Sequence, residues 1–158
     1  MTIKTGQLDN PQVQNLLIAH RQNMFEHSPP ESVHALDFSA FTTPNITLYT
    51  LWNRDELMGC GALSELTITH CEIKTMRTLQ AHLRKGVAAN ILTHILRQAV
   101  ERGYQRISLE TGTMDAFLPA VTLYKKFGFV ECEPFANYTQ DPHSMCMTLN
   151  LQKTKTRL

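Results

Sequence analysis

A basic turn with a glycine separates a predicted strand from a long predicted helix, in a sequence that suits anion binding. Free backbone N–H groups at a helix N-terminus, together with the positive end of the helix dipole, attract negatively charged oxygens. Gly86 lets the backbone approach such an oxygen closely, and Arg84 and Lys85 before it add positive charge. These residues predict a pyrophosphate site, and the alternative interpretation is an ordinary solvated helix start.

The phosphate-binding motifs of two large protein classes are missing from this sequence. No G-x-x-x-x-G-K motif followed by Ser or Thr occurs, so the turn at Gly86 is not a Walker loop. Gly59-Cys60-Gly61 lies inside a predicted hairpin strand and is not followed by a helix, unlike a dinucleotide-binding fingerprint. The predicted pyrophosphate therefore belongs to another kind of ligand.

Two motifs in this order resemble the GNAT N-acetyltransferase superfamily. The family's acetyl-coenzyme A (acetyl-CoA) signature, R/Q-x-x-G-x-G/A, is matched at Gly86 and Ala88, with Leu83 in place of Arg or Gln. The family's A-x-x-L-Y-x-x-x-G-F motif is matched over residues 120–129, with Phe117 where Asn often precedes it. The order of predicted elements resembles this fold over essentially the whole chain.

Three shorter segments narrow the resemblance to a bacterial branch of uncharacterised acetyltransferases. These segments are Pro29-Pro30-Glu31-Ser32, Glu72-Ile73-Lys74-Thr75-Met76-Arg77-Thr78 and Leu109-Glu110-Thr111-Gly112. Membership of such a branch says little about which acceptor receives the acetyl group.

The resemblance implies transfer of acetyl from acetyl-CoA to a primary amine of a small molecule or peptide by direct attack. It makes Tyr124 the general acid, because a phenol with a pKa near 10 is protonated at neutral pH. The alternative is that Tyr124 only packs within its helix. The pantetheine arm is expected along the strand edge at Met76, whose backbone N–H would bind the oxyanion. The cofactor contacts implied are Met76, Arg77, Thr78, Leu83, Arg84, Lys85, Gly86, Val87, Ala88, Ala89, Thr111, Phe117 and Tyr124.

A general base is also needed, because a primary amine with a pKa near 10.4 arrives protonated. Glu72, which shares a predicted strand face with Lys74, is the first candidate, directly or through a water. Glu65, at the end of the preceding predicted strand, is the second candidate, and His34 is the third. A plain surface charge is the alternative interpretation for each.

Acceptor specificity is expected from residues 28–37 and 135–144, which flank the mouth of the site in this fold. Glu31, His34 and Asp37 are the substrate-contact candidates in the first segment, and Asp141 is one in the second. The carboxylates of Glu31, Asp37 and Asp141 would attract a cationic amine, although such residues are also ordinary on loops and helix caps.

Two other functions are weighed against catalysis of this kind. A protein of the same fold acting as a non-catalytic acyl-CoA sensor or partner protein would accommodate Leu83 and Phe117, but it would have no need of Tyr124. A toxin that acetylates aminoacyl-tRNA is disfavoured by the net charge of +1, from 15 basic and 14 acidic residues. The same balance predicts no nucleic-acid and no membrane partner.

Hydrophobic periodicity predicts a mixed, mostly antiparallel sheet of about six to seven strands with helices on both faces. Because Ile73 and Met76 are three residues apart, a bulge is expected between them in their strand. Strands are predicted at residues 2–6, 46–52, 57–66, 71–78, 106–110, 129–133 and 144–151. Helices are predicted from Asn10 to the Ser28-Pro29-Pro30 break, and at residues 31–41, 86–103 and 115–127.

Length and composition predict one acyl-CoA N-acyltransferase domain over residues 1–152, followed by a flexible basic tail over residues 153–158. Four cysteines without a C-x-x-C pair, and no apolar run long enough to span a bilayer, favour a cytoplasmic protein. Cys60 is expected in the core. No metal is expected, since His20, His27 and His34 are spaced poorly for a shared ion. A homodimer, if one forms, would pair through the sheet edge near the C-terminus.

Overall fold

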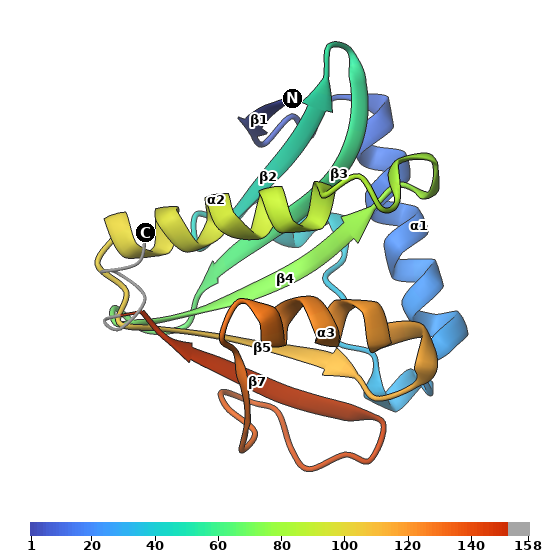
Figure 1. The fold of residues 1–158 in the computed structure, drawn as a ribbon. Coiled ribbons are helices and arrows are strands. Elements are labelled where there is room, and N and C mark those ends of the chain that lie inside the picture. Colours follow the sequence, from blue (N-terminus) through green and yellow to red (C-terminus); the bar gives the residue numbers. More distant parts are fainter. Residues whose placement is uncertain (152–158) are drawn as a thin grey trace.

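A seven-stranded sheet forms the centre of the computed structural model, which describes residues 1–151 (Figure 1). The strand order is β1-β2-β3-β4-β5-β7-β6, with only the β4–β5 pair parallel. This arrangement confirms the expected mixed, mostly antiparallel sheet. The strands are β1 (Thr2–Thr5), β2 (Ile46–Asn53), β3 (Glu56–Glu65), β4 (His70–Thr78), β5 (Arg106–Gly112), β6 (Val130–Cys132) and β7 (Ser144–Asn150). The α-helices are α1 (Pro11–His27), α2 (Val87–Glu101) and α3 (Leu118–Lys126).

The helices cover both faces of the sheet, and each face has its own apolar core. Helix α2 contributes a buried stripe that packs, with residues of α3, against strands β2 to β5 and β7; its members are Val87, Ile91, Leu92, Ile95, Leu96 and Ala99. Helix α1 buries Val13, Leu16 and Leu17 on the opposite face. Cys60 lies in this second core, as expected for a small apolar residue.

The bulge expected in β4 is present and falls opposite Gly61 of β3. The register shifts there, since Cys60 pairs with Arg77 while Ala62 pairs with Lys74. Thr75 adopts a positive φ of 58°, which accommodates the extra residue of the bulged strand. A Cβ at Gly61 would lie 2.5 Å from the sulfur of Met76, so the glycine makes room for the bulged side chain.

Strands β4 and β5 separate at their C-terminal ends, just where the bulge begins (Figure 1). Their pairing runs from His70 with Arg106 to Ile73 with Leu109 and then stops, although both strands continue. Beyond Leu109, β5 pairs only with β7 on its other side. The parallel pair therefore opens into a slot at its carboxyl end, the place where open sheets commonly bind ligands.

The helix predicted over residues 31–41 is wrong. The structure has two short 3-10 turns, Pro30–Ser32 and Phe38–Thr42, joined by an irregular segment. Val, His, Asp, Phe and Ser are weak helix formers, and Ser32 does not cap a helix. Its hydroxyl instead donates a 2.5 Å hydrogen bond to Asp141 Oδ2, which ties this segment to the loop before β7.

Two further boundaries differ from expectation in smaller ways. The helix predicted from Asp115 begins as a 3-10 turn, Asp115–Phe117, and α3 follows with Pro119 in its first turn. The edge strand β6 has only three residues, with Val130 exposed. Within the described residues, no helix is both long and apolar enough to cross a membrane. The predicted basic tail lies outside the described part of the chain.

Candidate active site

A cavity of about 120 Å³ occupies the slot where β4 and β5 separate. It is bounded by the two strand ends, by α1, by the segment after α1, by α3 and by the loop before β7. Its lining residues are His20, Met24, Ser28, Ser32, Val33, His34, Ala35, Glu72, Ile73, Lys74, Thr75, Met76, Glu110, Thr111, Gly112, Phe117, Ala120, Tyr124 and Tyr138. The structure thus brings residues from distant parts of the chain to one point.

The side chains of β4 and β5 give the slot two chemically different sides. Ile73 and Leu109 belong to the core beneath α2 and α3. Because successive side chains of a strand point to opposite faces, Glu72 and Glu110 lie on the other face, toward α1 and the loops. The strand separation lets a reacting group reach both faces at once.

Tyr124 comes from α3 and closes the apolar side of the slot. Its side chain is buried, and its ring packs edge-on against Phe129 with 5.7 Å between centroids. Burial raises the pKa of the Tyr124 phenol well above its ordinary value, so the hydroxyl stays protonated at any physiological pH. A proton donor is therefore available on this side of the cavity.

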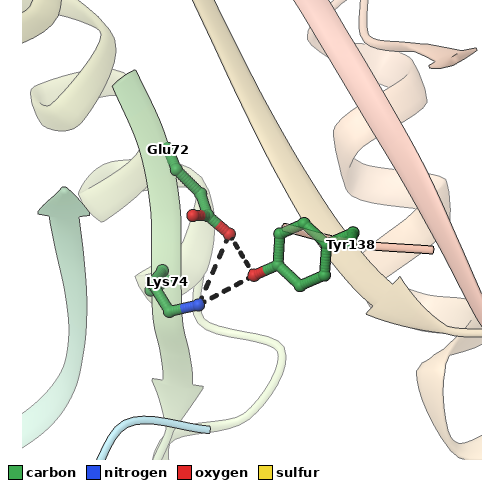
Figure 2. A network of polar contacts seen from close by, with 3 residues as sticks. All are labelled: Glu72, Lys74 and Tyr138. Carbon is green, nitrogen blue, oxygen red and sulfur yellow. Dashed lines mark hydrogen bonds and ion pairs between the residues drawn. The ribbon is translucent and has the colours of Figure 1, made fainter. Parts of the chain in front are cut away.

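Glu72, Lys74 and Tyr138 form a closed polar network on the other side (Figure 2). The Tyr138 hydroxyl accepts from Lys74 Nζ at 2.8 Å and donates to Glu72 Oε2 at 2.5 Å. Lys74 Nζ also lies 3.4 Å from the same carboxylate oxygen. An ammonium group can only donate, so the Tyr138 hydroxyl must accept from Lys74 and donate its own proton to Glu72. Glu72 therefore accepts from both neighbours.

Glu110 is a second carboxylate in the cavity, and its pKa is raised to about 7. Burial is the largest cause, because it disfavours the charged form. The negative charges of Glu72 and Asp141 raise this pKa further, whereas the positive charge of Lys74 and a hydrogen bond from Ser144 lower it. A carboxylate that titrates near neutral pH has the property required of a general base.

A second, larger hollow of about 330 Å³ adjoins the first on the polar side. His34, Ala35, Glu72, Lys74 and Tyr138 line both hollows, so the polar network stands between them. The remaining walls of the second hollow are formed by Leu66, Ala136 and Asn137. The first hollow thus continues into space large enough for a small molecule.

The N-terminus of α2 carries the features of the predicted pyrophosphate site. Gly86 caps the helix with a left-handed φ of 77°, and no side chain caps it by a hydrogen bond. Arg84 and Lys85 are exposed beside it, while Leu83 is 53 % exposed. The backbone N–H groups of the first helical turn remain available for an anion.

Phe117 takes an apolar role at the position where the related motif often has Asn. Its ring lies so close to Gly112 that a Cβ there would come within 2.3 Å of two ring carbons. A side chain at position 112 would therefore overlap the Phe117 ring, and glycine avoids this overlap. Met76, Thr111 and Tyr124 line the same cavity as Phe117, which brings four of the proposed cofactor contacts together.

Other predicted site residues lie away from the cavity. Glu65 is exposed at the end of β3 and accepts a 2.6 Å hydrogen bond from Tyr104. Glu31 and Asp37 are exposed and line neither hollow, unlike His34. The side chain of Arg77 turns to Asn23 of α1 at 2.9 Å, so only its backbone remains for a ligand along β4.

Two residues with chemical importance in the structure were not singled out from the sequence. Glu110 follows Leu109 in β5, whose apolar face holds Ile107 and Leu109, and this alternation was the available signal. Tyr138 had no such signal, because it lies in a loop that reaches Glu72 across 66 positions of sequence. No periodic pattern reports a contact of that kind.

Residues 1–151 contain no group of three or more His, Cys, Asp or Glu side chains able to hold a metal ion. Among the three histidines considered above, His20 and His34 line the cavity. The pKa of His20 is lowered to about 4, chiefly by burial and also by the charge of Arg77, so its imidazole is neutral.

Comparison with known proteins gives a consistent match. The profile of the Acetyltransferase (GNAT) family matches residues 11–129. The uncharacterized N-acetyltransferase YsnE of Bacillus subtilis (strain 168) is 52 % identical over 96 % of this chain and 100 % of its own. The uncharacterized N-acetyltransferase YedL of Escherichia coli (strain K12) is 48 % identical over 95 % of this chain and 94 % of its own. A GNAT family acetyltransferase from Elizabethkingia anophelis, solved with acetyl-CoA bound, superposes with a TM-score of 0.71 at 18 % identity, covering 94 % of this chain and 97 % of that one.

Proposed function

The chain belongs to the GNAT acetyltransferase family, and from this premise we propose that it transfers acetyl from acetyl-CoA to a primary amine, with Glu110 as base and Tyr124 as acid. The observation that carries the proposal is the slot between β4 and β5, which Tyr124 and Glu110 approach from opposite faces of the sheet. A thioester carbonyl held in this slot would have a proton acceptor on one side and a proton donor on the other.

The first step is removal of a proton from the acceptor's ammonium group. Glu110 is suited to this step, since its pKa of about 7 leaves a substantial unprotonated fraction at neutral pH. Glu72, the first candidate from the sequence, already accepts hydrogen bonds from Tyr138 and Lys74. We therefore assign Glu72 to the support of Glu110 and not to proton removal.

The second step is attack of the neutral amine on the thioester carbonyl carbon. A carbon–nitrogen bond forms, and the carbonyl oxygen gains a negative charge in the tetrahedral intermediate. We assign its stabilisation to a backbone N–H of the bulge around Met76, because β4 no longer pairs with β5 there. The bulge thus supplies a fixed dipole where the charge develops.

The third step is departure of the coenzyme A sulfur. The carbon–sulfur bond breaks, and the thiolate takes the proton of the Tyr124 hydroxyl. The nitrogen loses its remaining extra proton to Glu110, after that carboxylate has passed the first proton to solvent, and the neutral amide is released. One of the two protons returns to Tyr124 by way of solvent, and the other is the net proton of the reaction. Burial raises the pKa of Tyr124, but the same surroundings raise that of a thiol bound beside it. The difference in pKa between donor and acceptor is therefore smaller than the shift of Tyr124 alone would suggest.

The remaining parts of acetyl-CoA are assigned to the neighbouring elements. The backbone of Met76 and Thr78 at the end of β4 would contact the pantetheine arm, and Thr111 and Phe117 would line its path. The N-terminus of α2 from Gly86 would bind the pyrophosphate, supported by the exposed charges of Arg84 and Lys85. Leu83 would add an apolar contact in place of a polar one.

Two measurements test the proposal together. Thermal shift with acetyl-CoA, coenzyme A and NAD reports the cofactor site, and thiol release against a panel of amines reports the reaction. We expect a saturable shift with the coenzyme A species alone and thiol release with at least one amine. A shift without release from any amine would instead favour a non-catalytic acyl-CoA-binding protein, and no shift would contradict the cofactor site.

A further inference from the structure

We propose that the acceptor is an amine that also carries a carboxylate, in the manner of a free amino acid, and that Lys74 binds this carboxylate. The inference rests on the proposed function, because it places the acceptor's amine at Glu110. It adds the class of substrate, which neither the family match nor the relatives' names specify. Lys74 belongs to the polar network shown in Figure 2, which lies between the two hollows.

Lys74 has hydrogen-bonding capacity that the protein does not use. Its ammonium group has three N–H donors. One points to Tyr138 at 2.8 Å and one to Glu72 at a longer 3.4 Å. Within residues 1–151 no third acceptor contacts the ammonium, although the side chain is only 12 % exposed. One donor of a largely buried cation is thus left for a ligand.

The short hydrogen bond from Tyr138 gives Glu72 a partner besides Lys74. The phenol donates to Glu72 at 2.5 Å, so the carboxylate already has a short hydrogen bond without the lysine. A carboxylate entering beside Lys74 would therefore gain a charge-assisted hydrogen bond without stripping Glu72 of its partner. The Tyr138 ring, 5.5 Å from the ammonium, keeps the side chain in place.

The position of Lys74 between the two hollows sets the orientation of such an acceptor. Lys74 lines both hollows, whereas Glu110 lines only the first. An amino group in the first hollow would meet the negative charge of Glu110, and a carboxylate a few bonds away would meet Lys74. The acceptor's side chain would then extend into the second hollow beside Leu66 and Ala136.

The position of Lys74 argues against a polyamine as acceptor. A second ammonium group a few bonds from the first would be brought toward Lys74, and two like charges close together in a partly buried site repel. Lys74 therefore favours an anionic substituent near the reacting amine.

The test compares amines that differ only in the carboxylate. Each amino acid, for example alanine, phenylalanine or β-alanine, is paired with its neutral amide and with the amine that lacks the carboxyl group. The readout is the ratio of kcat/KM for the acid to kcat/KM for its amide, measured by thiol release. Because Glu110 and Tyr124 act on both members of a pair, damage to the chemical step cancels in this ratio.

We expect the native enzyme to favour the acid in at least one pair by about tenfold or more, as a charge-assisted hydrogen bond would give. Lys74→Met should lower this ratio by about tenfold relative to the native enzyme, while Lys74→Arg should retain most of it. The matched control is Lys4→Met, which removes an exposed cation from β1 at the far edge of the sheet and should leave the ratio unchanged.

Three outcomes would overturn the inference, and they differ in what they leave standing. Equal or better turnover of the amides by the native enzyme would reject the carboxylate-bearing acceptor and keep the transferase. An acid preference that survives Lys74→Met would reject Lys74 as the anchor. If none of the amines gave thiol release, the proposed function would be rejected, and the inference with it.

Discussion

The two sides of the slot set the pKa of a titratable group in different ways. On the α3 side, Tyr124 is surrounded by apolar side chains, and burial alone raises its pKa. On the loop side, Glu110 is also buried, but it is faced by Glu72, Lys74 and Asp141, whose charges act in opposite directions. One side keeps a proton on its group, and the other holds its group near the point of half-protonation.

This difference shows how a single opening in a sheet can serve two proton transfers. A proton donor needs only a low-polarity environment, since the neutral phenol is the form that donates. The pKa of a buried carboxylate also depends on the charges around it, because they raise or lower the energy of its charged form. The loop side is therefore the more sensitive of the two to charge-changing substitutions, and the following predictions test that view.

Loss of the Glu110 carboxylate should have the largest effect on the reaction. We expect Glu110→Gln to lower kcat/KM for amine acetylation by about 10³-fold, within the range of general base catalysis. The affinity for acetyl-CoA, measured by thermal shift, should stay within about threefold of native, because the carboxylate faces the acceptor. The matched control is Glu65→Gln, which should retain native activity. A Glu110→Gln enzyme with normal kinetics would remove this residue as the base.

Removal of the Tyr124 hydroxyl should have the next largest effect. Tyr124→Phe keeps the ring and its edge-on contact with Phe129 but deletes the proton donor. We expect kcat to fall about 10²-fold with little change in acetyl-CoA affinity or thermal stability. Thiol release under saturating substrates measures kcat. An unchanged kcat would leave Tyr124 as a packing residue only.

The pH profile of activity should shift in opposite directions when the negative and the positive neighbour of Glu110 are removed. Activity should rise as pH increases through about 7, since the unprotonated carboxylate is the active form. Glu72→Gln removes a charge that raises the Glu110 pKa, so this acid limb should move to lower pH. Lys74→Met removes a charge that lowers that pKa, so the limb should move to higher pH. Each shift should be on the order of half a unit to one unit.

The measurement is kcat/KM between pH 5.5 and about 9, the span over which a carboxylate with a raised pKa and an amine both titrate. The neutral amide acceptors are used, so that the carboxylate contact proposed for Lys74 does not enter the profile. Shifts of the same sign in both variants would contradict the charge balance described for this side.

A smaller effect is expected on the apolar side, and it concerns stability. Gly112→Ala should destabilise the protein by about 1–3 kcal/mol, because the new methyl group would overlap the Phe117 ring. This loss should appear as a lower midpoint in thermal or urea unfolding. The matched test is the double variant with Phe117→Ala, in which the methyl group has room. If the two substitutions were additive, the close packing of ring and glycine would not be the cause.

The sequence predicted most of the sheet because each strand and helix repeats its apolar residues with a regular period. The stripe on α2 and the alternation of Ile107 and Leu109 in β5 fix which faces are buried, and the bulge in β4 followed from the spacing of Ile73 and Met76. Residues 31–41 were mistaken for a helix because Val33, Leu36 and Ala40 share helical spacing. In the structure the conformation of this segment is set by contacts with distant residues, among them Asp141.

The candidate site was predictable in part for the same reason. Tyr124 and the turn at Gly86 lie in local motifs, which sequence alone reveals. The assignment of a base was not available, since Glu72 and Glu110 differ only in their surroundings. Tyr138 occupies the hydrogen-bonding capacity of Glu72, and this contact comes from a loop whose path no local pattern describes.

The tie between Ser32 and Asp141 has a consequence for how such enzymes diverge. It joins two surface segments, residues 28–37 and 133–143, into a common wall that surrounds the acceptor side of the slot. The bulge, the separated strands and Tyr124 belong to the sheet and α3, and none of them depends on the identity of that wall. Exchange of loop residues can therefore change the acceptor side of the slot without altering the bulge, the strand separation or Tyr124.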